Sequence, residues 1–190
     1  MQYRNEKLRY YIITAIFTAI TAVLAQITIP LPTVVPITGQ TLAVGIVATI
    51  LGSRQGTLVM AMYALLGGIG VPVFAEFSGG PQVLIGPSGG FIFGFIITAF
   101  IIGLILEKTR FTFSMALFAN LVGMCITMLV GVVQLKFVLS VGWAEAMAIG
   151  VTPFIAGGIL KAVLAAYLGV EVRKRLLSNG MLKTTTTVTN

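Results

Sequence analysis

The chain contains no histidine and no aspartate, and it has one cysteine and one tryptophan among 190 residues. Without histidine or aspartate, a Ser-His-Asp catalytic triad cannot form. One cysteine and five scattered glutamates do not supply the ligand set of a catalytic zinc site. No G-x-x-x-x-G-K-[ST] motif occurs, so the chain has no Walker loop for nucleotide phosphates. We therefore expect a protein that binds a molecule without transforming it, with no cofactor and no metal site.

Charge is also scarce. Charged residues make up 9% of the chain and hydrophobic residues 57%, and that charged share is about a third of the usual one. Such a chain cannot cover a water-exposed surface, and its long, unalternating apolar stretches favour membrane helices over a barrel. The net charge of +7 could indicate nucleic acid, but the basic residues are scattered. The composition predicts an all-α membrane protein in a lipid bilayer, without a nucleic-acid partner.

Six apolar stretches approach the roughly 20 residues that a membrane-crossing helix needs. The second and third are the least distinct, because "GSRQG" at residues 52–56 interrupts them. We interpret the first stretch as a retained helix, since it is longer than the core of a cleaved signal peptide. We expect one substrate-binding domain over residues 1–178 and a disordered tail over 179–190. The predicted spans cover approximately residues 10–29, 38–52, 56–74, 89–106, 113–134 and 152–172.

The basic residues predict the orientation. With the N-terminus inside and six spans, ten of the twelve lysines and arginines fall on the cytoplasmic side. Lys136 falls outside and Lys161 lies within a span. We expect a multi-pass protein of the cell (plasma) membrane with both termini cytoplasmic. Two outer loops rich in glycine and proline, residues 28–40 and 70–90, are expected to fold back as lids, with rigid turns as the alternative.

Lys161 lies alone in the run "GGILKAVLAAYLG", with no charged residue within nine positions on either side. It is roughly 13–14 Å into the last predicted span, near the membrane midplane. An intramembrane ammonium indicates a functional site, although snorkelling to the interface is the alternative. No glutamate is obviously placed to pair with it. We therefore expect its partner to be the ligand, an anion and most simply a carboxylate.

Other polar residues are weaker candidates. Gln40, Gln82, Asn120 and Gln134 could contact a ligand, but amide side chains inside spans more often connect helices. Trp143 is most simply an interfacial anchor, and it could also cover an apolar ligand. A stripe of alanines in the first span indicates either packing within the bundle or a docking face for another membrane protein. The stripe consists of Ala15, Ala19, Ala22 and Ala25.

Four sequence blocks together resemble the BioY family, the biotin-specific S components of energy-coupling-factor transporters. They are "IPLPTVVPITGQTLAV", "LLGGIGVPVFA", "GPSGGFIFGF" and "PFIAGGILKA", in order and at about the expected spacing. The resemblance covers roughly residues 10 to 170. It implies a six-helix membrane subunit that binds biotin near its outer face and works with a membrane coupling protein and two cytoplasmic ATPases.

The resemblance also implies roles for individual residues. The biotin carboxylate would meet Lys161, the third block adds Gly89 and Phe91 to the substrate-binding candidates, and Ala15 and Ala19 would contact the coupling protein. One position departs from the family pattern, because Gly158 stands where an aspartate is usual, which leaves the ureido contacts undefined. Two alternatives remain: an autonomous carrier for another small carboxylate, and a membrane scaffold in which Lys161 only bonds backbone carbonyls.

Overall fold

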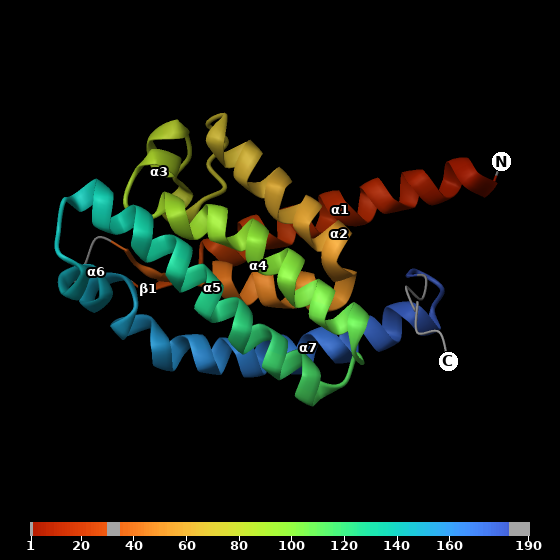
Figure 1. Cartoon of the computed structure of the whole chain (residues 1–190). Helices are drawn as coiled ribbons and strands as arrows, with labels where there is room; N and C mark the ends of the chain where they lie inside the picture. Colours follow the sequence, from red (N-terminus) through yellow and green to blue (C-terminus); the bar gives the residue numbers. More distant parts are fainter. Residues whose placement is uncertain (1, 30–34, 183–190) are drawn as a thin grey trace.

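The computed structural model describes residues 2–29 and 35–182 of the chain, and most of them are helical (Figure 1). Two short strands, β1 (Thr28–Ile29) and β2 (Ile37–Thr38), pair antiparallel at one end of the bundle. Two 3-10 turns span Ala75–Phe77 and Thr152–Phe154. The helices are α1 (Gln2–Ala25), α2 (Gln40–Gly68), α3 (Pro81–Ile85), α4 (Gly89–Lys108), α5 (Phe113–Leu139), α6 (Trp143–Gly150) and α7 (Ile155–Ser178).

Five stretches of the described residues are long and apolar enough to cross a membrane, which agrees with the predicted helical membrane protein. Helix α2 covers most of the predicted second and third spans, and residues 69–74 of the third span lie after the helix, so the stretches number five where the sequence predicted six. The predicted tail begins with a hydrogen-bonded turn over residues 179–182, and residues 183–190 lie outside the described range. The five stretches are Glu6–Ala25, Gln40–Gly68, Gly89–Lys108, Phe113–Leu139 and Trp143–Ser178.

Helix α2 reverses direction at Gly52, whose φ of 81° and ψ of −172° are not helical. A Cβ placed on Gly56 would lie 3.2 Å from the Cα of Ala48, whereas residues eight apart in a straight helix are about 12 Å apart. The two arms of α2 therefore lie against each other, and the bend is visible near the α2 label in Figure 1. The interruption predicted from "GSRQG" is confirmed, and glycine is suited to it because its φ is positive.

A group of polar side chains, here called the turn cluster, holds this reversal. The Glu107 carboxylate at the end of α4 accepts hydrogen bonds from the Ser53 backbone N–H and the Ser53 hydroxyl, both at 2.7 Å. Arg173 of α7 is buried, donates to the carbonyl of Ile50, and lies 3.7 Å from the ring centroid of Phe111. The turn cluster thus joins α2, α4 and α7 at one end of the bundle.

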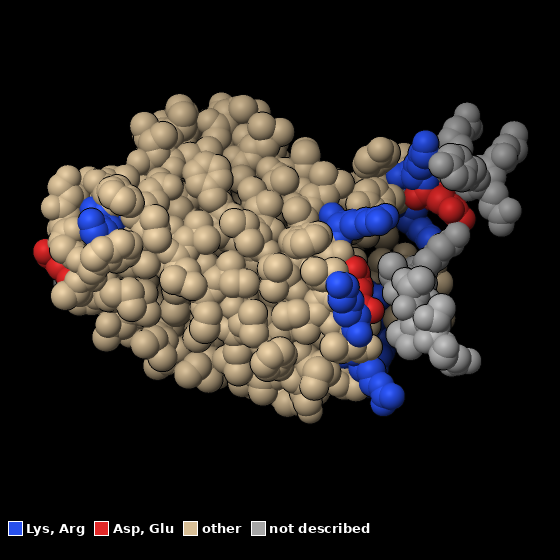
Figure 2. All heavy atoms as spheres, in the orientation of Figure 1, with Lys and Arg blue, Asp and Glu red and all other residues tan. Residues whose placement is uncertain are grey.

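Charge is concentrated at that same end. Figure 2 shows lysine and arginine gathered where α1 begins and α7 ends, while the opposite end carries a small charged group. That group contains Lys136, in the last turn of α5, and Glu145, in the first turn of α6. The arrangement agrees with the one-sided placement of basic residues in the sequence. It also defines two ends: a basic end, and a loop end that carries β1, β2, α3 and α6.

Candidate ligand-binding site

Two adjoining cavities lie toward the loop end of the bundle. The outer cavity has a volume of about 260 Å³ and lies between the start of α2, the start of α4 and the segment 74–88. The inner cavity, about 60 Å³, lies deeper between α2, α4, α5 and α7. Together their volume lies at the lower end of the roughly 300–1,000 Å³ typical of small-molecule sites. Their common lining residues are Thr41, Phe91, Phe154 and Lys161.

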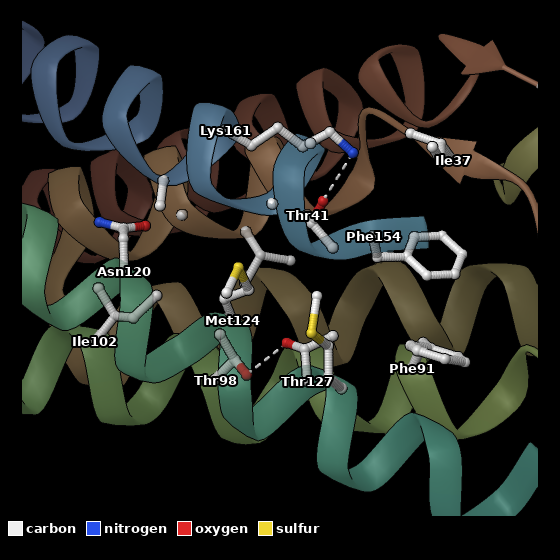
Figure 3. A pocket seen from close by; sticks show the side chains of 16 residues that line it. Ile37, Thr41, Phe91, Thr98, Ile102, Asn120, Met124, Thr127, Phe154 and Lys161 are labelled. Atoms are coloured by element: carbon white, nitrogen blue, oxygen red, sulfur yellow. Dashed lines mark hydrogen bonds between the residues drawn. The ribbon is translucent and has the colours of Figure 1, made fainter. Parts of the chain in front are cut away.

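Lys161 lies where the two cavities meet, and it has protein partners that the sequence did not predict. Its Nζ donates to the backbone carbonyl of Thr38 at 2.6 Å and to Thr41 Oγ1 at 3.3 Å, and Figure 3 shows the second of these bonds. Both partners are neutral, and no carboxylate of the described residues lies within ion-pair distance of this amine. An ammonium has three N–H donors. One donor and the whole positive charge therefore remain for a ligand.

The inner cavity contains a polar group from three helices. Asn120 of α5 is buried, and its Nδ2 donates to Thr49 Oγ1 at 3.1 Å and to the carbonyl of Ala116 at 2.8 Å. The hydroxyls of Thr98 and Thr127 lie 2.8 Å apart, and these two residues also line the cavity (Figure 3). The structure thus brings Asn120, a candidate from the sequence, to the same cavity as the lysine. It also adds two threonines that sequence reasoning missed, since threonine inside a span is common.

The outer cavity brings together two of the three predicted glutamines, Gln40 and Gln82. Gln40 Nε2 donates to the Tyr63 hydroxyl at 2.7 Å, and Gln40 Oε1 accepts from Thr38 Oγ1 at 2.8 Å. Gln82 Nε2 donates to the carbonyl of Gly79 at 2.6 Å. Both glutamines line the cavity while bonded to the protein. They can contact a ligand only by sharing or exchanging these bonds.

Three further candidates have different positions. Phe91 lines both cavities, and its ring centroid is 6.2 Å from that of Phe154, so two aromatic rings border the passage between them. Gly89 is buried at the start of α4 but is not among the lining residues, and a Cβ there would collide with the backbone of Leu84. Trp143 is 55% exposed on α6, beside Lys136, and lines neither cavity of the described residues.

The segment that covers the outer cavity is held by two glutamine side chains from separate parts of the chain. Gln26, just after α1, donates to the carbonyl of Phe74 at 3.1 Å and accepts from the N–H of Phe77 at 2.9 Å. Gln134 of α5 donates to the carbonyls of Leu84 at 2.7 Å and Gly86 at 2.9 Å. Sequence reasoning did not single out Gln26. The available signal was a glutamine near a helix end. The long loops of this chain have many backbone groups that need hydrogen-bond partners, and such a glutamine can supply them.

Replacing Gln134 by Leu is expected to loosen the segment at Leu84 and Gly86. Two hydrogen bonds to partly buried carbonyls are lost, and amide exchange there should become faster by about tenfold or more. Hydrogen–deuterium exchange of peptides covering residues 81–92 measures this. Gln82→Leu removes an exposed amide that bonds within its own turn, and it should change exchange in α4 very little. Equal effects of the two substitutions would show that Gln134 does not hold the segment.

Comparison with known proteins assigns the chain to a family. The model of the BioY family matches residues 1–178. The biotin transporter BioY of Thermotoga maritima is 42% identical over 88% of this chain and 97% of that protein. The biotin transporter BioY2 of Lactococcus lactis is 38% identical over 91% of this chain and 94% of that protein.

A solved structure agrees with this result. The crystal structure of the S-component for biotin from an ECF-type ABC transporter superposes with a TM-score of 0.83 at 28% identity. The match covers 90% of this chain and 93% of that one. The fold with the two cavities is therefore that of a membrane-embedded S component. The chain belongs to the BioY family.

Proposed function

We propose that the chain is the biotin-binding S component of an energy-coupling-factor transporter, which captures biotin outside the cell and passes it inward. The observation that carries the proposal is the Lys161 ammonium, which lies at the junction of two cavities with one donor unused. A buried cation without an ionic partner is costly, and a carboxylate ligand removes that cost. The relatives named as biotin transporters support biotin as that ligand.

The geometry supports one arrangement of the ligand. The inner cavity is too small for a fused ring system, whereas the outer cavity has about 260 Å³ and borders Phe91 and Phe154. The rings of biotin would occupy the outer cavity, where Gln40 and Gln82 offer amide groups to the ureido ring. The carboxylate chain would then extend inward to Lys161. Gly158 lines the inner cavity, so α7 supplies no carboxylate there, and the polar side chains that the outer cavity offers to the ureido group include Gln40, Gln82 and the carboxylate of Glu76.

Equilibrium binding of radiolabelled biotin to the purified protein tests the proposal. We expect saturable binding of one biotin per chain, displaced by unlabelled biotin but not by octanoate, which has a carboxylate and no ureido ring. Absence of saturable binding would identify a scaffold, in which Lys161 only bonds the carbonyl of Thr38. Displacement by octanoate with equal strength would indicate a carrier for other carboxylates. Uptake into vesicles that hold this chain alone would indicate a carrier that needs no ATPase.

The fold supports a six-span topology with both termini cytoplasmic. The two arms of α2 would cross the membrane in opposite directions, because the chain reverses at Gly52. The basic end would then face the cytoplasm, in agreement with the positive-inside rule. This orientation opens the outer cavity toward the outside of the plasma membrane. It also places the turn cluster at the cytoplasmic end.

The exposed face of α1 supports docking to a membrane coupling protein. The buried residues of the helix include Thr14, Thr18 and Thr21, each of which bonds the carbonyl four residues earlier, and Ala25 of the alanine stripe is buried as well. Ala15 and Ala19 are exposed, each next to one of these threonines on the helix. Small residues on an exposed helix face let another helix approach closely. The coupling protein would dock here and connect the subunit to two cytoplasmic ATPases.

The double substitution Ala15→Leu, Ala19→Leu should leave biotin binding unchanged and prevent assembly with the coupling protein. Two leucines push a docked helix away, and neither position lines a cavity. Co-purification with the coupling module and biotin uptake by cells measure the effect, and we expect uptake to fall at least about tenfold for a lost contact of this size. Ala148→Leu, at an exposed alanine of α6, is the control and should retain uptake. Normal assembly of the double variant would exclude this face.

A further inference from the structure

Tyr63 is a buried polar residue that the proposed binding site does not use directly. It lies in the second arm of α2, is completely buried, and is not among the described residues that line either cavity. The reversal at Gly52 brings it beside Gln40 of the first arm, whose Nε2 donates to the Tyr63 hydroxyl at 2.7 Å. A buried phenol hydroxyl needs such a partner. Any effect of Tyr63 on a ligand must therefore pass through the residues that it contacts.

On one side, these contacts lead to Lys161. Gln40 directs its Nε2 toward Tyr63, and its Oε1 accepts from Thr38 Oγ1 at 2.8 Å. The backbone carbonyl of Thr38 in turn accepts from Lys161 Nζ at 2.6 Å. Because a glutamine amide has one donor end and one acceptor end, the bond to Tyr63 fixes which end faces Thr38. The placement of the carbonyl that holds Lys161 therefore depends on Tyr63.

On the other side, the contacts lead to the rim turn, defined here as residues 74–78. The Phe74 ring is buried and packs edge-on against the Tyr63 ring, with the two centroids 5.3 Å apart. Gly67 makes room for this ring, since a Cβ at that position would collide with it. Tyr63 thus contacts one lining residue of the outer cavity through its hydroxyl and another through its ring. The rim turn lines that cavity with Phe74, Ala75, Glu76 and Ser78.

The rim turn has a backbone that depends on its surroundings. Glu76 and Phe77 have φ angles of 56° and 53°, in the left-handed region that favours glycine. Such conformations are costly and persist where neighbouring contacts fix them. The Phe74 ring against Tyr63 is one such contact. The bonds of Gln26 to the Phe74 carbonyl and the Phe77 N–H are another. Loss of either contact lets the rim turn relax.

We propose that Tyr63 is a positioning residue that couples the rim turn to Lys161, so that the turn is held in the same state that binds the ligand tightly. A ligand at Lys161 keeps Thr38 and Gln40 in place, and through Tyr63 this favours the held rim turn. Because linkage is reciprocal, a rim turn released from Gln26 lowers the affinity for the ligand by the same factor. This inference rests on the proposed function, because it takes biotin as the ligand.

A double-mutant cycle of Tyr63→Phe and Gln26→Leu tests the coupling. Neither side chain is among the described lining residues, and their hydrogen bonds go to different partners. Tyr63→Phe keeps the ring against Phe74 and removes the bond to Gln40, whereas Gln26→Leu releases the rim turn. Each should raise the dissociation constant of biotin by about fivefold, the usual effect of a lost hydrogen bond. The double variant should also lose only about fivefold, whereas independent effects would multiply to about 25-fold.

Amide exchange of the rim turn gives a readout that a merely structural role of Tyr63 would not change. In the unaltered protein, saturating biotin should slow exchange in peptides covering residues 73–80 by at least about tenfold. In Tyr63→Phe, saturating biotin should slow it by less than about threefold, because the turn no longer depends on Gln40. Tyr167→Phe removes an exposed hydroxyl of α7 and is the matched control, which should behave like the unaltered protein. Thermal unfolding of each variant shows whether it is folded.

The outcomes separate this inference from the proposed function. If biotin binds and the two substitutions multiply in the cycle, the role of Tyr63 is overturned. Equal protection of the rim turn by biotin in Tyr63→Phe and in the unaltered protein overturns it as well, since the ligand then acts on the turn by direct contact. Absence of biotin binding by the unaltered protein overturns the proposed function, and this inference with it.

Discussion

Replacing Lys161 by Ala is expected to lower the affinity for biotin by at least about 100-fold, since a desolvated charge pair loses one partner. The substitution leaves the ligand carboxylate in a cavity whose other polar groups already have partners, such as Asn120 and the Thr98–Thr127 pair. The protein itself should remain folded, because only two hydrogen bonds to Thr38 and Thr41 are lost. Isothermal titration calorimetry of the purified protein measures the loss.

Two further substitutions make this result specific. Lys136→Ala removes the partly exposed ammonium at the loop end, beside Phe137 and Trp143, and it should leave affinity for biotin unchanged within about twofold, as expected for surface charges. Lys161→Arg keeps the charge but enlarges the group in a confined junction, and it should retain part of the affinity for biotin. Unchanged binding by Lys161→Ala would refute the carboxylate pairing.

The second large effect is expected in the turn cluster, where Glu107→Ala should destabilise the protein by about 2–4 kcal/mol. The N–H and hydroxyl of Ser53 lose their acceptor, and the buried guanidinium of Arg173 loses a nearby negative charge. For a chain of this length, such a loss lowers the midpoint of thermal unfolding by about 5–10 °C. Scanning calorimetry in detergent measures this change.

The control for the turn cluster is Glu171→Ala. Glu171 pairs with Arg175 at 2.9 Å on the exposed surface of α7, one turn apart, and such a pair contributes about 0.3–0.5 kcal/mol. Its removal should shift the midpoint by less than about 2 °C. Glu107→Gln keeps one acceptor for Ser53, and its shift in the unfolding midpoint should lie between those of Glu107→Ala and Glu171→Ala. If Glu107→Ala and Glu171→Ala behave alike, the carboxylate does not hold the reversal of α2.

The sequence predicts the membrane class and the position of the break in α2 because both depend on local signals. Apolar length marks each helix, and the glycines of "GSRQG" mark the point where the chain can turn. The charge pattern likewise identifies the basic end. Helix α6 was missed, since eight residues between two long helices were interpreted only as an outer loop. Its first turn contains Trp143, which was predicted to be an interfacial anchor or a cover for an apolar ligand.

The partners of polar side chains could not be predicted in the same way. Lys161 bonds the carbonyl of Thr38, 123 positions earlier in the chain, and every residue type carries a backbone carbonyl. Arg173 was counted as a cytoplasmic surface charge, but it is 5% exposed and its Nε has no partner among the described residues. A pattern of residue types does not show which helix end packs against a charged side chain and buries it. That depends on how α2, α4 and α7 meet in three dimensions.

Gln26 connects the end of α1 to the rim of the outer cavity. It follows Ala15 by eleven positions, roughly 16 Å along the axis of α1, and it bonds the rim of the outer cavity at Phe74 and Phe77. Any partner that draws α1 along its axis must break these two bonds or carry the rim with it. A force applied at Ala15 and Ala19 would therefore loosen the rim of the outer cavity, because the Gln26 side chain connects that rim to α1.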